Sequence, residues 1–419
     1  MNIFHLPTLL TTIFLLIVIS YYALLLLPKK KPKIEKRFKS ITVIIPAHNE
    51  EMYIEEAIRS VIRAKFKGEK EIIVVDDGSI DRTAEIAKKF EERGQIKLIR
   101  TKHSGKSASM NKALEIAKGE LIAVVDGDSY IYENGLAEMA AEVSRDDVVA
   151  ACCPVRVRNR NRFVCMWLHL VEVYFSLIRG LYAKINANIT TPGPLSIYRK
   201  KELKEVGWFS TDLFSEDADI AIKMIRKGHK IGYTEKTIAE TNMPHKLKWI
   251  FYQRLRFARG LVKLLKKHMQ LNKAIIDIYT MPIFLFTYIQ SIIMGSITLY
   301  QMISGYITYF ASQGTYFNIW VVKFLFEWLS MFGFINWTIR VFSGQDPMTY
   351  LAFIGIISTF LTYPLYLIAF LRYDKKIDLR HIFPFIFLPP FWLFIMAAQV
   401  LSIPEIFRKK QYNIWKKNE

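Results

Sequence analysis

The stretch LIAVVDGDSYI, residues 121–131, decides the fold prediction. Its first five residues are apolar, as expected for a short strand buried on both faces of a parallel sheet. The run ends at Asp126, Gly127 and Asp128. Aspartate and glycine favour a turn after a strand, but two carboxylates in this place also suit a hard divalent cation with a diphosphate. In that second case, Gly127 would let a bulky ligand approach the backbone.

Three earlier apolar runs repeat this pattern, and a stretch with helical periodicity follows each of them. The pairs are ITVIIP (41–46) with a helix from about Glu50, EIIVV (71–75) with a helix from about Asp81 to Gly94, and IKLIR (96–100) with a helix from about Gly105 to Gly119. Strands that alternate with helices predict an α/β domain with a mostly parallel sheet covered on both faces. In such sheets, ligands bind at the carboxyl ends of the strands.

The residues at these predicted strand ends are mostly polar: Ala47, His48, Asn49 and Glu50 after the first strand, Asp76 and Asp77 after the second, and Asp126 and Asp128 after the fourth. The second group suits a nucleoside, whose base or ribose donates hydrogen bonds to carboxylates, but an acidic turn with Asp81 capping the next helix explains it equally. A Walker phosphate loop is excluded, because Arg100 stands where its first glycine belongs. Lys106 remains a charge partner for a nucleotide.

Apolar stretches flank this α/β region. The chain is 52% hydrophobic and 14% aromatic, which predicts a membrane part beside the soluble one. Residues 3–27 can cross about 30 Å of hydrocarbon and lack a cleavage site, so they predict a retained anchor. Four further spans are predicted near 275–302, 316–341, 348–371 and 382–404. Within the second of these, Lys323 and Glu327 stand four residues apart and can neutralise each other or line a pore.

The charge distribution predicts the topology. The net charge is +20, and much of the excess lies beside apolar spans, which indicates lipid contact and not nucleic acid. The basic stretch 28–39 predicts a cytoplasmic catalytic domain by the positive-inside rule. Five spans would return the basic tail 406–419 to the cytoplasm and would place Arg372 on the opposite side.

The region between the α/β motifs and the later spans contains two informative helices. Ser215 is a predicted N-cap of a helix that ends near Gly228, which places Asp217 in the first turn, where the helix dipole favours an ionised carboxylate. Such acids also simply stabilise helix starts. The basic stretch 245–268 predicts an amphipathic helix in the membrane interface. Its Gln253, Arg256 and Phe257 share one helical face.

Seven motifs stand in an order and spacing that resemble family 2 inverting glycosyltransferases of GT-A fold: TVIIPAHNE (42–50), VVDDGS (74–79), GKSASMN (105–111), VVDGDS (124–129), PGPLSIYR (192–199), SEDADI (215–220) and QRLRF (253–257). The chain is most similar to the membrane-embedded branch that contains poly-N-acetylglucosamine, hyaluronan, chitin and cellulose synthases. The resemblance covers about residues 41–272, and the membrane spans match in layout only. It implies a Rossmann-like GT-A domain with a transmembrane helical bundle.

The resemblance also implies roles for individual residues. Those implied for the nucleotide sugar are Pro46, Ala47, His48, Glu50, Asp76, Asp77, Lys106, Asp126, Gln253 and Arg256. Asp128, with Asp126, is the implied ligand of Mg²⁺ or Mn²⁺, and Asp217, with Glu216 beside it, matches the catalytic base. Gly193, Pro194 and Phe257 are implied at the acceptor. The family usually has tryptophan where this chain has Phe257, which leaves the acceptor open.

These inferences define the expected organisation and activity. We expect an anchor at 1–29, a GT-A domain at 40–245, an interface helix at 246–272, a bundle of about four helices at 273–405 and a cytoplasmic tail at 406–419. The predicted protein lies in the plasma membrane, extends a β-linked polysaccharide from a UDP-sugar with inversion, and translocates it. Two alternatives stay open: transfer of one sugar to a membrane lipid, and a silent scaffold that binds nucleotides.

Overall fold

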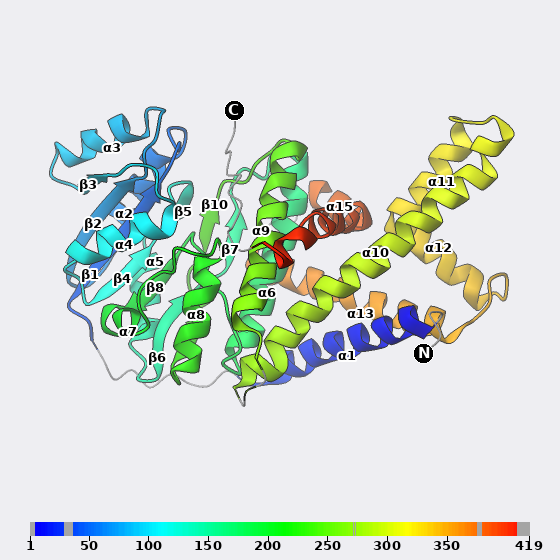
Figure 1. Ribbon diagram of the computed structural model, residues 1–419, viewed down its shortest axis with the longest axis horizontal. Helices are drawn as coiled ribbons and strands as arrows, with labels where there is room; N and C mark the ends of the chain where they lie inside the picture. The colour runs from blue at the N-terminus through cyan, green and yellow to red at the C-terminus, as the bar shows by residue number, and fades with distance from the viewer. Residues whose placement is uncertain (1–4, 29–36, 271, 273, 375–378, 409–419) are drawn as a thin grey trace.

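The structure is a computed structural model that describes residues 5–28, 37–270, 272, 274–374 and 379–408. The predicted topology signals in 29–36 and in the tail 409–419 lie outside the described residues. Figure 1 shows a sheet with its covering helices at one end, and long helices that extend away from it.

The central sheet has seven strands in the order β3-β2-β1-β4-β8-β6-β9. Their bounds are β1 (Ser40–Ala47), β2 (Glu69–Asp76), β3 (Lys97–Arg100), β4 (Leu121–Val124), β6 (Val148–Cys152), β8 (Ser196–Arg199) and β9 (Lys230–Tyr233). Strand β8 runs antiparallel to β4 and β6, while the other pairs are parallel. The predicted mostly parallel sheet is therefore confirmed. A second sheet contains β5 (Ser129–Ile131), β10 (Ala239–Thr241) and β7 (Val155–Val157) in that order.

Alternating residues of the buried strands pack against helices on the two faces of the sheet. Ile44 points into one core with α4 and α8, whereas Val43 and Ile45 point into the other core with α2, α3 and α5. This alternation follows from the two-residue period of a strand. The helices of this part are α2 (Ile54–Arg63), α3 (Thr83–Glu91), α4 (Lys106–Ile116), α5 (Gly135–Val143), α7 (Lys200–Glu205) and α8 (Glu216–Arg226).

Two long helices connect the sheet to the apolar part of the chain. Helix α9 (Leu247–His268) occupies the stretch predicted as an amphipathic interface helix. Helix α6 (Phe163–Ala183) has no counterpart in the sequence prediction. It is apolar enough to cross a membrane, but most of its apolar stretch is buried inside the protein, where it packs on β7 and α13.

The apolar part contains α1 (Leu6–Leu26), η2 (Ile276–Thr280), α10 (Met281–Tyr309), η3 (Ala311–Gln313), α11 (Ile319–Leu329), α12 (Met331–Phe342), α13 (Tyr350–Tyr373), η4 (Leu379–His381), α14 (Ile382–Ile386), α15 (Leu388–Val400) and η5 (Ile403–Ile406). Within the described residues, five helices are long and apolar enough to cross a membrane. The predicted span 316–341 instead consists of α11 and α12, which bend by 86°. The break lies at Ser330, which is extended and whose hydroxyl accepts a hydrogen bond from the Gly333 N–H.

The direction of α13 corrects the predicted topology. In Figure 1, α11 and α12 both lie far from the sheet, so α13 runs back toward the sheet. At its end, the Arg372 guanidinium lies 2.8 Å from a carboxylate oxygen of Glu235, which follows β9. The prediction that Arg372 faces the side opposite the catalytic domain is therefore wrong, because the bent pair does not act as one crossing. Lys323 and Glu327, the charged pair noted within the predicted span 316–341, each have a contact of their own. The Lys323 ammonium group lies over the Trp320 ring, and the Asn336 amide donates a hydrogen bond to a Glu327 carboxylate oxygen.

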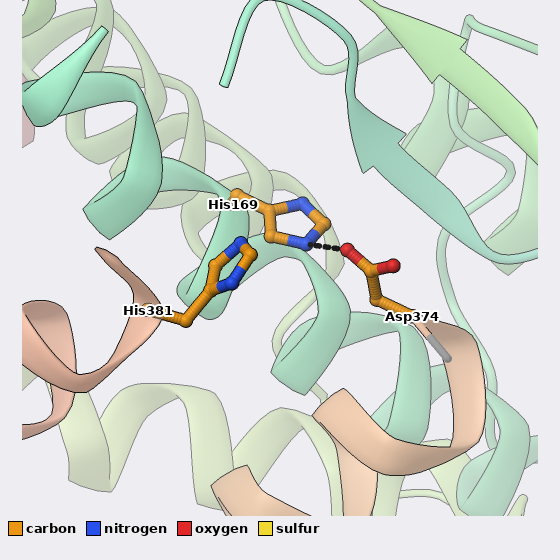
Figure 2. A group of neighbouring side chains, drawn as sticks. All are labelled: His169, Asp374 and His381. Atoms are coloured by element: carbon orange, nitrogen blue, oxygen red, sulfur yellow. Dashed lines mark hydrogen bonds and ion pairs between the residues drawn. The ribbon is translucent and has the colours of Figure 1, made fainter. Parts of the chain in front are cut away.

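A buried ion-pair junction holds the end of α13 against α6. Figure 2 shows Asp374 and His381 beside His169, whose Nε2 lies 2.9 Å from an Asp374 oxygen. The Val157 N–H donates to Nδ1 of His169, so Nε2 carries the proton and donates to Asp374. Arg160 also pairs with Asp374, and Arg156 lies 4.0 Å away. These cations already balance the carboxylate, so the group works as a structural junction and is a poor cation site.

Candidate active site

A cavity of about 1200 Å³ begins at the carboxyl ends of β1, β2 and β4 and continues between α9, α10, α13 and α15. The predicted site residues line it, with the exception of Asp76. The Asp76 side chain is 1% exposed, accepts a hydrogen bond from the Ser79 N–H and lies 3.6 Å from Arg100. The topology therefore brings together motifs that are up to about two hundred residues apart in the chain.

Lys106 joins the end of β4 to the start of α8. It is the first residue of α4, and its Nζ atom lies 2.7 Å from Asp126 Oδ1 and 3.0 Å from Glu216 Oε1. Burial opposes the charge on Lys106, but the two carboxylates outweigh that effect and raise its pKa. The ammonium group is therefore held charged between two motifs that the sequence separates.

Burial raises the pKa of two carboxyls in this site. For Asp126, the charge of Lys106 opposes the shift, while the charge of Asp128 adds to it. For Asp217, burial and the charge of Glu216 raise the pKa to about 6, against the attraction of Lys106. A carboxylate that titrates near neutrality is suited to accept a proton during catalysis, so the environment of Asp217 favours the role of general base.

The charge of the site suits a divalent cation. We call the four carboxylates that influence one another here the acidic cluster: Asp126, Asp128, Glu216 and Asp217. Among the described residues, the cations that face this cluster are Lys106 and Arg256, so four negative and two positive charges leave a net charge of −2. Mg²⁺ and Mn²⁺ bind carboxylate oxygens, so the donor set fits such an ion, with Asp128 and Asp126 as the predicted ligands.

Two glycines bring the backbone close to the acidic cluster. A Cβ atom on Gly193 would lie 2.1 Å from Asp126 Oδ2, and the Asp126 N–H donates to the Gly193 carbonyl. Gly193 therefore lies directly against Asp126 of the acidic cluster. At Gly127, a Cβ atom would be 3.2 Å from atoms of Ala47 and Glu50. The missing side chain at Gly127 therefore leaves room for the end of β1 and for Glu50, and Gly127 also lines the cavity, so close approach of a ligand to its backbone stays a prediction.

The part of the cavity beside β1 and β2 contains His103, a residue that the sequence analysis passed over. His103 stacks on His48, with 4.2 Å between ring centroids. Asp77 accepts hydrogen bonds from the N–H groups of Ser104 and Gly105. Burial raises the pKa of Asp77, but hydrogen bonding to Ser109, to these two N–H groups and to Thr101 together outweighs it, and the net shift of the pKa is downward. Asp77 thus shapes the loop before α4. The sequence feature that could have identified His103 is its position three residues before Lys106, in the same loop.

Helix α9 forms the wall between the acidic cluster and the apolar helices. Gln253, Arg256 and Phe257 all line the cavity. Phe257 is 45% exposed, and the guanidinium carbons of Arg254 and Arg256 each lie 5.5 Å from its ring centroid. Arg254 also lines the cavity, although the sequence analysis did not select it. Its position three residues before Phe257 was the available signal.

Comparisons with known proteins define the class. The family model "Glycosyl transferase family 2" matches residues 42–207. A mannosyltransferase of Pyrobaculum calidifontis, solved in complex with GDP-Man and Mn²⁺, aligns with a TM-score of 0.59 and 19% identity over 95% of this chain and 97% of that one. The chain therefore carries a family 2 glycosyltransferase domain of GT-A fold and is a glycosyltransferase, an enzyme that uses a nucleotide sugar.

Sequence relatives indicate which glycosyltransferases the chain is similar to. Poly-β-1,6-N-acetyl-D-glucosamine synthase of Staphylococcus epidermidis is 24% identical over 385 residues, which cover 90% of this chain and 86% of the relative. The synthase of the same description from Staphylococcus aureus strain COL is 27% identical over 240 residues, or 55% of this chain and 57% of that one. The chain is thus homologous to poly-N-acetylglucosamine synthases, which agrees with the resemblance found in the sequence.

Proposed function

We propose that the protein is a processive inverting glycosyltransferase that extends a β-linked polysaccharide from a UDP-sugar at the cytoplasmic face of the plasma membrane and passes the product through its own helices. The observation that carries this proposal is the continuity of the cavity. It joins the acidic cluster to the space between α10, α13 and α15. Relatives described as polysaccharide synthases, of which the first covers most of this chain, support the same function.

In the proposed reaction, Asp217 accepts the proton of the acceptor hydroxyl. The acceptor oxygen forms a bond to the anomeric carbon while the bond from that carbon to the diphosphate breaks on the opposite side, which inverts the configuration. The backbone N–H of Ala218 donates to Asp217 Oδ1 at 2.9 Å and so orients the carboxylate. Glu216 remains paired with Lys106. Its negative charge lies beside Asp217 and contributes to the raised pKa of Asp217.

The donor would be held at the other side of the acidic cluster. Asp128 and Asp126 would hold Mg²⁺ or Mn²⁺, and such an ion stabilises the charge that develops on a leaving diphosphate. Lys106 and Arg256 provide positive charge for the same diphosphate. Their present attraction to the acidic cluster keeps both side chains in place before the donor binds.

Besides Phe257, other aromatic side chains line the cavity, and these suit the apolar faces of sugar rings. They include Trp249, Tyr252, Tyr363 and Trp392. A phenyl ring at position 257 offers such a face without the indole donor that the family usually has. This difference, together with the opening of the cavity between apolar helices, keeps a lipid acceptor as the second candidate function.

The test uses the full chain in lipid nanodiscs with Mg²⁺ or Mn²⁺ and radiolabelled sugar donors. UDP-N-acetylglucosamine comes first because of the relatives, followed by other UDP-sugars and GDP-mannose. Product of high molecular mass that a glycosidase degrades would support the proposal and identify the monomer. Label that moves entirely into an organic phase would favour the glycolipid reaction. Failure to consume any donor would leave the nucleotide-binding scaffold.

A further inference from the structure

Arg254 is a buried cation on the wall of the cavity. It is 8% exposed, and its Nε atom is buried without a hydrogen-bond partner. Its guanidinium carbon lies 5.5 Å from the ring centroid of Phe257 and 5.8 Å from that of Phe391 on α15. Among the described residues, it makes no hydrogen bond or ion pair of its own. A charge buried in this way is unfavourable unless a partner compensates for it.

The surrounding charges do not compensate for this cation. Glu172 on α6 is the acid that attracts Arg254, but a carboxylate oxygen of Glu172 already accepts from the Arg179 guanidinium at 2.9 Å. Two guanidinium groups and one carboxylate leave a net charge of +1. Burial lowers the pKa of Arg254 to about 10, and the attraction of Glu172 offsets only part of that effect. The site therefore carries a surplus positive charge.

This surplus charge lies apart from the donor site. Arg256 is attracted by the acidic cluster, whereas Glu172 is the acid that attracts Arg254 in the part of the chain that the structure describes. The two arginines are two positions apart on α9, so they leave the helix in nearly opposite directions, about 200° apart. Phe257 contacts both of them. An anion at Arg254 would therefore belong to the acceptor side of the cavity and not to the donor diphosphate.

We propose that Arg254 binds an oxyanion, a carboxylate or a phosphate, that the acceptor carries. The inference rests on the proposed function, because it takes the acceptor to occupy the cavity beyond Phe257. A guanidinium group binds such anions through two parallel hydrogen bonds, and the rings of Phe257 and Phe391 lie beside the guanidinium group. A neutral hydroxyl-rich acceptor would leave the buried charge uncompensated. The site thus selects an acidic polysaccharide or a phosphate-bearing lipid.

Two matched pairs of probes test this site by isothermal titration calorimetry in nanodiscs, with UDP and Mg²⁺ present. The first pair is a tetrasaccharide of alternating glucuronate and N-acetylglucosamine, and the same tetrasaccharide with its carboxyl groups reduced to alcohols. The second is farnesyl phosphate and farnesol. Each is titrated into the wild type, Arg254→Gln and Arg254→Lys. Lys266→Gln is the control, because it removes one charge from the exposed side of the same helix.

We expect the wild type to bind the anionic member of one pair about tenfold more tightly than its neutral partner. Arg254→Gln should abolish this preference and leave UDP binding unchanged, Arg254→Lys should keep part of it, and Lys266→Gln should keep all of it. Preference for the tetrasaccharide carboxylate assigns a polysaccharide, and preference for farnesyl phosphate assigns a lipid. Equal binding of both members of both pairs by the wild type overturns the inference, as does a preference that survives Arg254→Gln.

Because this readout is binding, it remains separate from the transfer assay. A wild type that transfers sugar without any preference for anions would retain the proposed function and refute the oxyanion site. If the protein turns over no donor but shows an anion preference that depends on Arg254, the oxyanion site would be retained and the proposed function refuted.

Discussion

Replacing Asp217 by asparagine should abolish transfer and, at the same time, stabilise the protein. Loss of a positioned general base lowers the rate by about 10²–10⁴-fold. The stability effect follows from the raised pKa: a change from 3.8 to about 6 on folding corresponds to about 3 kcal/mol of unfavourable free energy when the carboxyl is ionised. Water in the open cavity will reduce this value, so it is an upper bound.

The sign of the stability effect depends on pH. A carboxyl whose pKa rises on folding destabilises the folded state above its unfolded pKa, most fully above its folded pKa of about 6. Asparagine carries no charge, so the advantage of Asp217→Asn should be greatest above pH 6 and should shrink as the pH falls toward 3.8. In a unit of this size, about 1 kcal/mol shifts the Tm by about 2–4 °C, so the variant should melt several degrees higher at pH 7.5.

The assay measures transfer and thermal melting of the same nanodisc samples at pH 7.5 and at pH 4.5. Asp212→Asn is the matched control, because Asp212 is on the loop before α8 and its side chain is 63% exposed. The control should change neither quantity appreciably. Retention of more than about one hundredth of the wild-type rate would refute the role of Asp217 as base. A Tm for Asp217→Asn that equals that of the wild type at both pH values would refute the electrostatic argument.

Three further predictions concern the same site and its support. Gly193→Ala should abolish donor turnover, because its Cβ would lie 2.1 Å from Asp126 Oδ2; turnover equal to that of wild type would contradict this geometry. The transfer rate should fall as the pH drops below about 6, where Asp217 gains a proton, and a pH-rate profile that stays flat down to pH 5 would exclude this residue as the titrating base. Asp374→Asn should lower the Tm, because it leaves Arg160 without its carboxylate, and limited proteolysis near the end of α13 should become faster; an unchanged digestion pattern would argue against the junction.

The sequence predicted those elements whose signals are local. β1 to β4 and the helices between them were predictable because each strand is a continuous apolar run closed by a turn. The strands β5, β7 and β10 were missed, since three residues are too few to display a period. Helix α6 was missed because its apolar residues are buried on several sides, against β7, α1 and α13, so it lacks the polar face by which a surface helix is identified.

In the site, the sequence motifs predicted which residues line the cavity better than they predicted what each one contacts. Asp76 and Asp77 look equivalent in the sequence, yet the sheet turns Asp76 toward Arg100, while Asp77 lines the cavity and holds the loop before α4. Gly127 shows the same limit, because Ala47 at the end of β1 and Glu50 leave little space for a side chain there, and the sequence around Gly127 does not report these contacts. Such contacts join segments that are distant in sequence, and no local pattern reports them.

The position of the apolar helices relative to Asp217 depends on α9, which packs closely on both sides. A Cβ atom on Gly260 would lie 2.4 Å from Ser215 Oγ, so α9 lies directly against the start of α8. Ser215 is the residue immediately before Glu216 and Asp217 of the acidic cluster. On its other side, Arg259 lies 3.6 Å from Glu405, a carboxylate that is 1% exposed on η5, just after α15. Helix α9 therefore contacts both α15 with η5 and the helix that carries Asp217. Helix α9 also presents Arg254 and Phe257 to the cavity, so the residues proposed for the acceptor, the proposed base and the apolar helices all contact this one helix or belong to it.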